Sequence, residues 1–98
     1  MSASCYILYS KSLNRFYVGA TNETIEQRLK KHNNHSYGRH RYTSRASDWE
    51  VFLNIAAMNY AHAIRMERKI KSMKSKIFIQ NLKNYPELRQ KILNQTST

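Results

Sequence analysis

The fold depends first on two short apolar segments near the N-terminus, Cys-Tyr-Ile-Leu-Tyr-Ser at residues 5–10 and Arg-Phe-Tyr-Val-Gly at residues 15–19. Both are rich in aromatic and β-branched residues, which favour β-strands. The turn-like stretch Lys-Ser-Leu-Asn at residues 11–14 separates them. The sequence therefore predicts an antiparallel hairpin with a four-residue loop. Gly19 is predicted to end the second strand, where a backbone needs room or an unusual dihedral angle.

The rest of the chain predicts one more strand and several helices. Thr24 and Gln27 match a helix-capping box. The predicted elements after the hairpin are a helix to about residue 33, a basic loop over 34–47, a strand over 49–57, helices over 59–73, 75–83 and 86–93, and a polar tail over 94–98. We therefore expect the α/β (α+β) class, with a small three-stranded antiparallel sheet flanked by helices in the order β-β-α-β-α-α(-α). Length predicts a single domain over residues 1–98, with its core at about 5–83.

Apolar residues at helical spacing predict which helix faces are buried. In the helix over 59–73 the buried positions are expected to be Ala63, Met66, Ile70 and Met73. In the next helix, Ile77 and Phe78 are expected to point inward.

The charge of the chain predicts a polyanionic partner. Its 98 residues include 17 Lys and Arg against 6 Asp and Glu, a net charge of +11. Nucleic acid is the commonest such partner, an anionic membrane is the alternative, and a merely solvated basic surface is the third interpretation. The single Cys5 excludes an internal disulfide and a Cys-rich zinc site. One thiol, no signal peptide and no apolar run long enough to span a membrane together predict a cytoplasmic, intracellular protein.

The scarcity of acids limits metal chemistry. A site built from three or four carboxylates around two ions would need most of the six acids in one place. Glu23 and Glu26 are expected in the first turn of a helix, where acids favour the helix dipole. If the protein is a metal enzyme, one carboxylate and one ion are expected.

Five polar residues are candidates for a site. Tyr6 and Tyr17 can reach the same end of the hairpin, although strand tyrosines more often only pack across strands. Arg28 and His32 share one side of a helix and suit a phosphate and a proton, although both could simply face solvent. Glu67 stands among six Lys and Arg, either as a metal ligand or as an ion-pair partner of a lysine four residues on. The remaining histidines are interpreted as loop or helix-surface residues: His35, His40 and His62.

The motifs around these residues resemble the GIY-YIG nuclease superfamily. The two half-motifs correspond to Ser-Cys-Tyr at 4–6 and Tyr-Val-Gly at 17–19. Residues 27–33 resemble the first-helix signature of the family, 48–51 the entry to its third strand, and 63–71 the helix that carries its metal-binding Glu. The resemblance is greatest to the small stand-alone bacterial members related to the N-terminal nuclease domain of the excision-repair endonuclease.

The chain departs from the family pattern in three places. Only the Tyr of the first tripeptide is kept, and the stretch from Gly19 to Arg28 is one residue longer than in many relatives. For the polar residue that the family often has after the Glu, the candidate is Asn81.

The resemblance implies a metal-dependent DNA endonuclease with one ion, Mg²⁺ or Mn²⁺. Carried over by position, Glu67 holds the metal and Arg28 clamps the scissile phosphate. Tyr6 activates or orients the attacking water, while Tyr17 and His32 complete the proton path. The substrates implied are duplex, nicked, branched or flapped DNA, and DNA repair is the implied setting.

Basic residues beyond the site are expected to bind nucleic acid without reading its sequence. Tyr37 and Tyr42 could stack on unpaired bases or cap a small core. Three hypotheses stay open: the endonuclease, a non-catalytic nucleic-acid-binding module on the same fold, and a basic membrane-surface protein. The oligomeric state and a recruiting protein partner are also open. The predicted nucleic-acid contacts are Lys31, Arg39, Arg41, Arg45, Arg68, Lys71 and Lys74.

Overall fold

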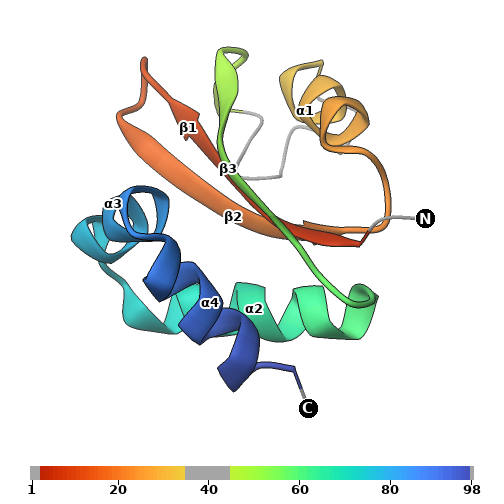
Figure 1. Cartoon of the computed structure of the whole chain (residues 1–98). Helices are drawn as coiled ribbons and strands as arrows, with labels where there is room; N and C mark the ends of the chain where they lie inside the picture. Colours follow the sequence, from red (N-terminus) through yellow and green to blue (C-terminus); the bar gives the residue numbers. More distant parts are fainter. Residues whose placement is uncertain (1–2, 35–44, 98) are drawn as a thin grey trace.

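A computed structural model of the chain describes residues 3–34 and 45–97 and shows a sheet flanked by helices (Figure 1). The elements are β1 (Ser4–Ser10), β2 (Arg15–Thr21), α1 (Ile25–Asn33), β3 (Trp49–Ala56), α2 (Tyr60–Met73), α3 (Lys76–Asn84) and α4 (Pro86–Gln95). Their order confirms the predicted α+β class. Within the described residues, no helix has the length and apolar character needed to cross a membrane.

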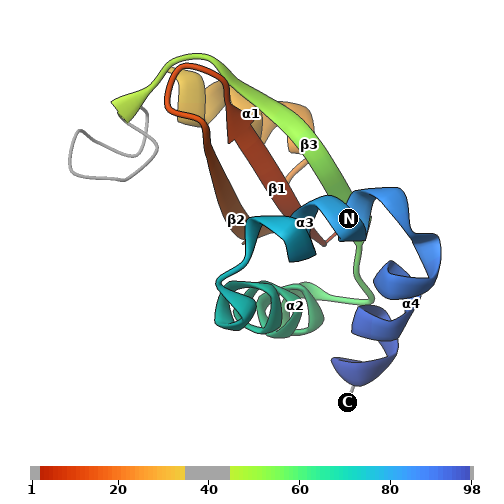
Figure 2. The ribbon, with the colours of Figure 1, turned by 90° about the vertical axis from the view of Figure 1, so that its left-hand side faces the viewer.

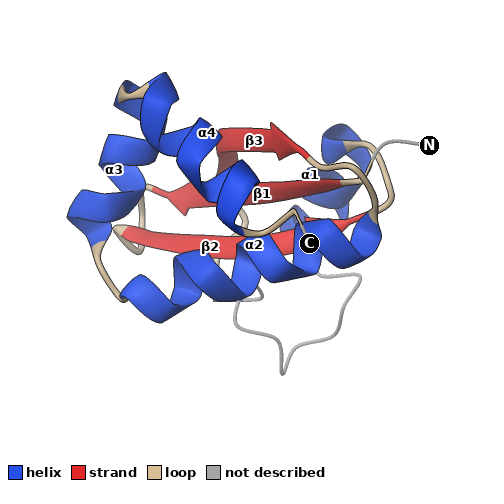
Figure 3. Cartoon of the chain, turned by 60° about the horizontal axis from the view of Figure 1, so that its bottom comes forward, coloured by secondary structure: helices blue, strands red, loops and turns tan. Residues whose placement is uncertain are grey.

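The hairpin strand β1 forms the middle of the sheet. Both neighbours pair with it antiparallel, in the order β2-β1-β3 (Figure 3). On the β2 side, Tyr6 stands opposite Gly19 and Leu8 opposite Tyr17. The strand β2 continues to Thr21, so the prediction that Gly19 ends it is wrong. Gly19 lies inside the strand because it serves as a cross-strand partner of Tyr6.

Alternating side chains of β1 divide the interior between the two faces of the sheet. Cys5 and Ile7 pack against α2, α3 and α4, while Tyr6 and Leu8 pack against α1 and Trp49. The ribbon shows this division, with α1 on one side of the sheet and the other three helices on the opposite side (Figures 1 and 2). The two faces therefore have separate environments, and a residue's place along β1 decides which environment it enters.

The helix α1 is fixed at both ends. Its predicted capping box is present, since the Thr24 hydroxyl accepts from the Gln27 amide and the Gln27 side chain accepts from the Thr24 amide. At the other end, Asn33 Nδ2 donates to the Trp49 carbonyl at 3.0 Å, and the Trp49 amide donates to Asn33 Oδ1 at 2.8 Å. This pair of bonds joins the end of α1 to the first residue of β3.

Asp48 joins the start of β3 to the hairpin loop. Ser10 Oγ donates to its carboxylate at 2.7 Å, and the amide of Ser12 donates at 2.9 Å. These hydrogen bonds hold the pKa of the Asp48 carboxyl below its usual range. The carboxylate therefore stays ionised, and keeps its bonds, well into the acid range.

Two of the predicted buried positions are wrong. Met73 is 44% exposed and Ile77 is 70% exposed. Met73 is the last residue of α2, which ends at Lys74 in a left-handed backbone conformation. The turn that follows re-aims the chain, so α3 presents Phe78 and the buried Leu82 to the core instead. These two lie on one side of α3 because they are four residues apart.

The interpretation of His62 as a surface residue and of residues 94–98 as a frayed tail is also corrected. His62 is buried, and its Nδ1 accepts from the Met58 amide at 3.1 Å. Its Nε2 lies 3.1 Å from the hydroxyl of Thr96, which is buried too. The helix α4 continues to Gln95, and it brings Thr96 to the start of α2. A contact between residues 34 positions apart cannot be read from local sequence patterns.

Candidate active site

Tyr6, Arg28 and His32 form a hydrogen-bonded cluster on the α1 face of the sheet. The Tyr6 hydroxyl lies 2.9 Å from Nε2 of His32. Arg28 donates to the same oxygen from Nη2 at 3.1 Å and from Nε at 3.4 Å. Tyr6 and His32 are buried, whereas the Arg28 side chain is 21% exposed. The guanidinium is thus the member of the cluster that a ligand in solution can reach.

Tyr17 stands beside this cluster on β2. Its ring centroid is 5.0 Å from that of His32 and 6.3 Å from that of Tyr6. Trp49, at 6.4 Å, supports the ring from β3. Tyr17 is only half-buried, whereas Tyr6 has no exposed surface. The two tyrosines therefore differ in their access to solvent although they share one face.

Gly19 gives the Tyr6 ring its place. A Cβ at this position would lie 2.5 Å from both Cζ and the hydroxyl oxygen of Tyr6. Real Cβ atoms do not approach other atoms so closely, so any other residue would push the ring aside. Gly19 is thus required for space, which is one of the two reasons that the sequence left open.

We expect Gly19→Ala to destabilise the protein by about 1–3 kcal/mol, as overpacking of a filled interior does. The displaced Tyr6 ring would also lose its bonds to Arg28 and His32. Urea unfolding of the wild type and the variant measures the change. A double-mutant cycle with Tyr6→Ala isolates the clash, because Gly19→Ala should cost much less once the ring is gone. An equal cost in both backgrounds contradicts this explanation.

Glu67 reaches this site from the other side of the sheet. Its helix α2 packs along β2, which is an edge strand, and the Glu67 side chain is 22% exposed. Lys71 Nζ donates to Glu67 Oε2 at 2.7 Å and lies 5.8 Å from the Tyr17 ring centroid. The ion pair that the sequence allowed is therefore present. Four of the five candidates meet directly, and Glu67 lies next to them across the edge of β2.

Cys5 is not a nucleophile in this site. The thiol is buried on the α2 face of β1, and burial raises its pKa to about 12, with a smaller contribution from Glu67. A thiol with such a pKa is almost entirely protonated near neutral pH. Its place is the hydrophobic core, beside Ile7.

Glu23 is a part of the site that was not predicted from the sequence. It forms an ion pair with Lys31 and a second one with Arg28 at 3.8 Å. The hydrogen bond from Lys31 holds the pKa of the Glu23 carboxyl below its usual range. Glu23 was expected in the first turn of the helix, but the cap is Thr24, so Glu23 precedes the helix and is directed toward Arg28. A strict interpretation of the capping box would have placed it there.

The predicted nucleic-acid contacts differ in their surroundings. Arg45, Arg68, Lys71 and Lys74 are exposed. Lys31 is paired with Glu23 and so contributes less free charge than expected. The other residues named for nucleic-acid contact or stacking lie outside the described residues: Arg39, Arg41, Tyr37, Tyr42, His35 and His40.

The residues around Glu67 fit a weakly held divalent ion. Within residues 3–34 and 45–97, no three His, Cys, Asp or Glu side chains come close enough to form a metal cage. Mg²⁺ does not need one, since it keeps several waters and is often bound through one or two carboxylates and substrate phosphates. Glu67 Oε1 accepts no hydrogen bond from the described part of the chain, so one oxygen stays available.

Comparison with known proteins assigns the chain to a family. The family model for the GIY-YIG catalytic domain matches residues 2–84. Neither the curated proteins nor the solved structures include a significant match. The family match covers most of the chain, including the hairpin, α1, β3 and α2. The chain therefore belongs to the GIY-YIG family of endonucleases, which are phosphodiesterases.

Proposed function

We propose that the protein is a metal-dependent DNA endonuclease that hydrolyses a phosphodiester bond with one divalent ion and with little sequence specificity. The observation that carries the proposal is the cluster in which Arg28 and His32 both contact the hydroxyl of Tyr6. A buried phenol bonded to a guanidinium and an imidazole is more than a packing residue needs. It combines a phosphate-binding cation with a group that accepts a proton near neutral pH.

The cluster has a defined direction for proton transfer. Arg28 can only donate, so its two bonds to the Tyr6 oxygen leave the phenolic proton to point at His32 Nε2 when the imidazole is neutral. A proton taken up by Tyr6 can therefore pass to His32. The guanidinium stabilises negative charge on the phenolic oxygen while its exposed side binds a phosphate oxygen.

The attacking water meets Tyr17 in this proposal. The sequence assigned water activation to Tyr6, but Tyr6 has no exposed surface and Tyr17 is half-buried. Tyr17 therefore contacts the water and holds it for attack on phosphorus. Tyr6 positions Arg28 and His32, and the water's proton leaves through the imidazole beside the Tyr17 ring.

Glu67 would hold the divalent ion, Mg²⁺ or Mn²⁺. When bound, the ion neutralises the charge that develops on the phosphoryl group and the leaving oxygen. Lys71, which bonds to the carboxylate in this structure, is then released toward the phosphate backbone. Asn81, the candidate for a further polar residue of the site, lies on α3 and is half-buried.

The substrate proposed is DNA with a duplex, nicked, branched or flapped structure. The net charge of +11 supports it, as do the exposed Arg45, Arg68, Lys71 and Lys74. We extend the proposal to kinship with the small stand-alone members related to the nuclease domain of the excision-repair endonuclease, to a single domain over 1–98, and to an intracellular role in DNA repair. So small a nuclease would find its substrate through a recruiting protein.

The test is cleavage of supercoiled plasmid and of flapped or branched oligonucleotides by the purified chain. Nicks are expected with Mg²⁺ or Mn²⁺ and not with EDTA. Salt-sensitive binding with no cleavage in either metal overturns the proposal and favours the non-catalytic binding module. Cleavage that persists in EDTA contradicts the metal requirement.

Lys74 offers a prediction that separates stability from DNA binding. It caps α2 in the left-handed region, with φ 49° and ψ 41°, where a side chain costs roughly 1 kcal/mol relative to glycine. Lys74→Gly should raise the free energy of unfolding by about that amount, and should lower the salt slope of DNA binding by about one ion. Lys74→Ala is the matched control, since it loses the charge and keeps the strain. Equal stability of the two variants contradicts the argument.

A further inference from the structure

A second cavity lies on the face of the sheet opposite the Tyr6 cluster. It has a volume of about 320 Å³ and is bounded by the hairpin, β3 and α3. Phe16 and Tyr17 are neighbours on β2, so they point to opposite faces, and Phe16 enters this cavity while Tyr17 joins the active site. We call it the aromatic–lysine cavity, and it is lined by Tyr9, Asn14, Phe16, Phe52, Lys76 and Gln80.

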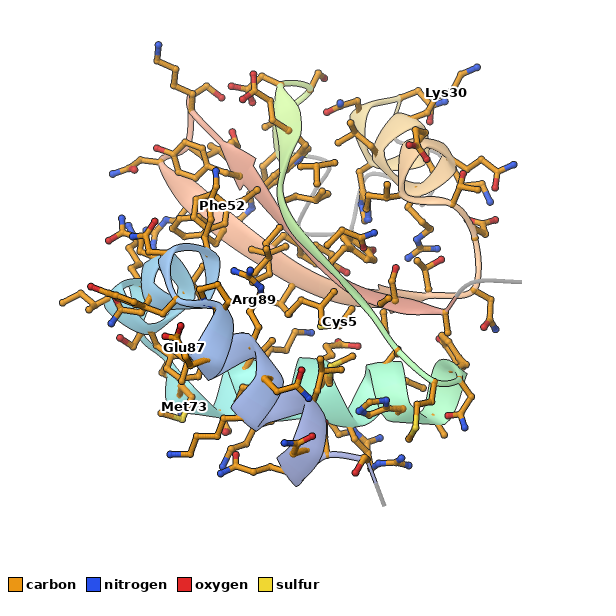
Figure 4. All side chains as sticks on the ribbon, viewed as in Figure 1. Cys5, Lys30, Phe52, Met73, Glu87 and Arg89 are labelled. Atoms are coloured by element: carbon orange, nitrogen blue, oxygen red, sulfur yellow. The ribbon has the colours of Figure 1, made fainter. Side chains whose placement is uncertain are left out.

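Three half-buried aromatic rings form one wall of the aromatic–lysine cavity. The Phe16 ring centroid is 5.0 Å from that of Tyr9 and 4.9 Å from that of Phe52, with an edge-on angle of 72° to Phe52. Phe52 is placed by an irregularity in the sheet. Ile7 pairs with Leu53 and Leu8 with Val51, so Phe52 is an extra residue with no partner on β1. Such bulges re-aim a side chain, here toward α3 (Figure 4).

Two lysines and two amides complete the aromatic–lysine cavity. Lys83 Nζ lies 4.6 Å from the Phe52 ring centroid, a cation–π contact. Lys76 Nζ donates to the Asn14 carbonyl at 3.1 Å, and Asn14 holds this position with a left-handed φ of 51°. The side-chain amides of Asn14 and Gln80 can both donate and accept hydrogen bonds. Aromatic rings, cations and amides thus meet in one small space.

We propose that the aromatic–lysine cavity binds an unpaired base of a nucleic acid strand together with its phosphate. Exposed aromatic surface beside lysines is the combination by which single strands are bound, the rings stacking on bases and the cations contacting phosphates. The amides suit the polar edges of a base. A base within a duplex is already stacked and cannot enter.

The consequence is a preference for DNA that carries a single-stranded branch or flap. The identity of the ligand as DNA rests on the proposed function, but the aromatic–lysine cavity does not share residues with the active site. Its role can therefore be tested separately from cleavage.

Binding of a short oligodeoxythymidylate with one central 2-aminopurine tests the proposal, since stacking quenches this base. Phe52→Leu, which keeps an apolar side chain, should weaken binding about tenfold and reduce the quenching. Lys76→Gln with Lys83→Gln changes only exposed residues and should also weaken binding several-fold, so a folding defect of the first variant leaves the test intact. The matched control is Lys30→Gln with Lys91→Gln, two exposed lysines on α1 and α4. Equal affinity of all variants overturns the proposal.

Cleavage assays on the same variants distinguish this proposal from the proposed function. Nicking of fully duplex plasmid should be unchanged, whereas cleavage of flapped DNA should fall with the loss of single-strand binding. A wild-type protein that binds the oligonucleotide through these residues but cuts no DNA contradicts the proposed function and supports the aromatic–lysine cavity. Metal-dependent nicking with unaltered oligonucleotide binding by the variants leads to the opposite conclusion.

Discussion

Glu67→Gln is expected to lower the rate of metal-dependent DNA cleavage on the order of 10³-fold. The substitution keeps the size of the side chain and removes the charge that would hold the divalent ion. Stabilisation of a phosphoryl group by a bound metal is worth several kcal/mol, and about 4 kcal/mol corresponds to that factor. The measurement is the initial rate of plasmid nicking over a range of Mg²⁺ concentrations.

The fold should survive this substitution. Glu67 contributes one ion pair with Lys71, whose side chain is 50% exposed, and such pairs are worth about 0.3–0.5 kcal/mol in helices. Unfolding by urea should therefore change little. Glu87→Gln is the control, because Glu87 is an exposed acid on α4. A Glu67→Gln protein that nicks plasmid at the wild-type rate, with the same metal dependence, removes Glu67 from the site.

Tyr6→Phe is expected to lower cleavage about 10²-fold or more and also to destabilise the protein. Removal of the hydroxyl takes from Arg28 and His32 a buried partner that both contact. Loss of such a partner costs about 1–3 kcal/mol, and loss of a positioned proton-transfer group costs about 10²–10⁴-fold in rate. Urea unfolding and single-turnover cleavage measure the two effects on one preparation.

Tyr17→Phe is the comparison that separates the roles of the two tyrosines. If Tyr17 contacts the water and Tyr6 positions its neighbours, Tyr17→Phe should slow cleavage with little change in stability. Tyr6→Phe should change both, and it should also weaken DNA binding because Arg28 loses its orientation. If Tyr6→Phe cleaves normally while Tyr17→Phe is inactive, the cluster around the Tyr6 hydroxyl takes no part in the reaction.

The local parts of the fold were predictable from short patterns. The hairpin, the capping box at Thr24 and Gln27, and the starts of α2 and α4 each depend on residues within a few positions of one another. Backbone geometry and local hydrogen bonds decide such features, so the sequence carries them directly. The helix spacing of Arg28 and His32 is of the same kind.

The errors all involve contacts between distant segments. Met73 and Ile77 were assigned to the core from helical periodicity, but the turn at Lys74 sets the direction of α3. His62 was assigned to the surface, yet α4 returns to cover it through Thr96. Periodicity predicts which residues share a side of a helix and cannot state what that side meets.

The sequence by itself determined the family, the order of the elements and the residues that could do chemistry. The tertiary structure alone decided how those residues are divided. Because side chains alternate along β1, Tyr6 lies with Arg28 and His32, whereas Cys5 lies in the core beneath α2. Because β2 is an edge strand, Glu67 and Lys71 reach Tyr17 from the opposite face. The bulge at Phe52 and the ion pairs of Glu23 likewise depend on strand register and on the packing of α1, which no local pattern specifies.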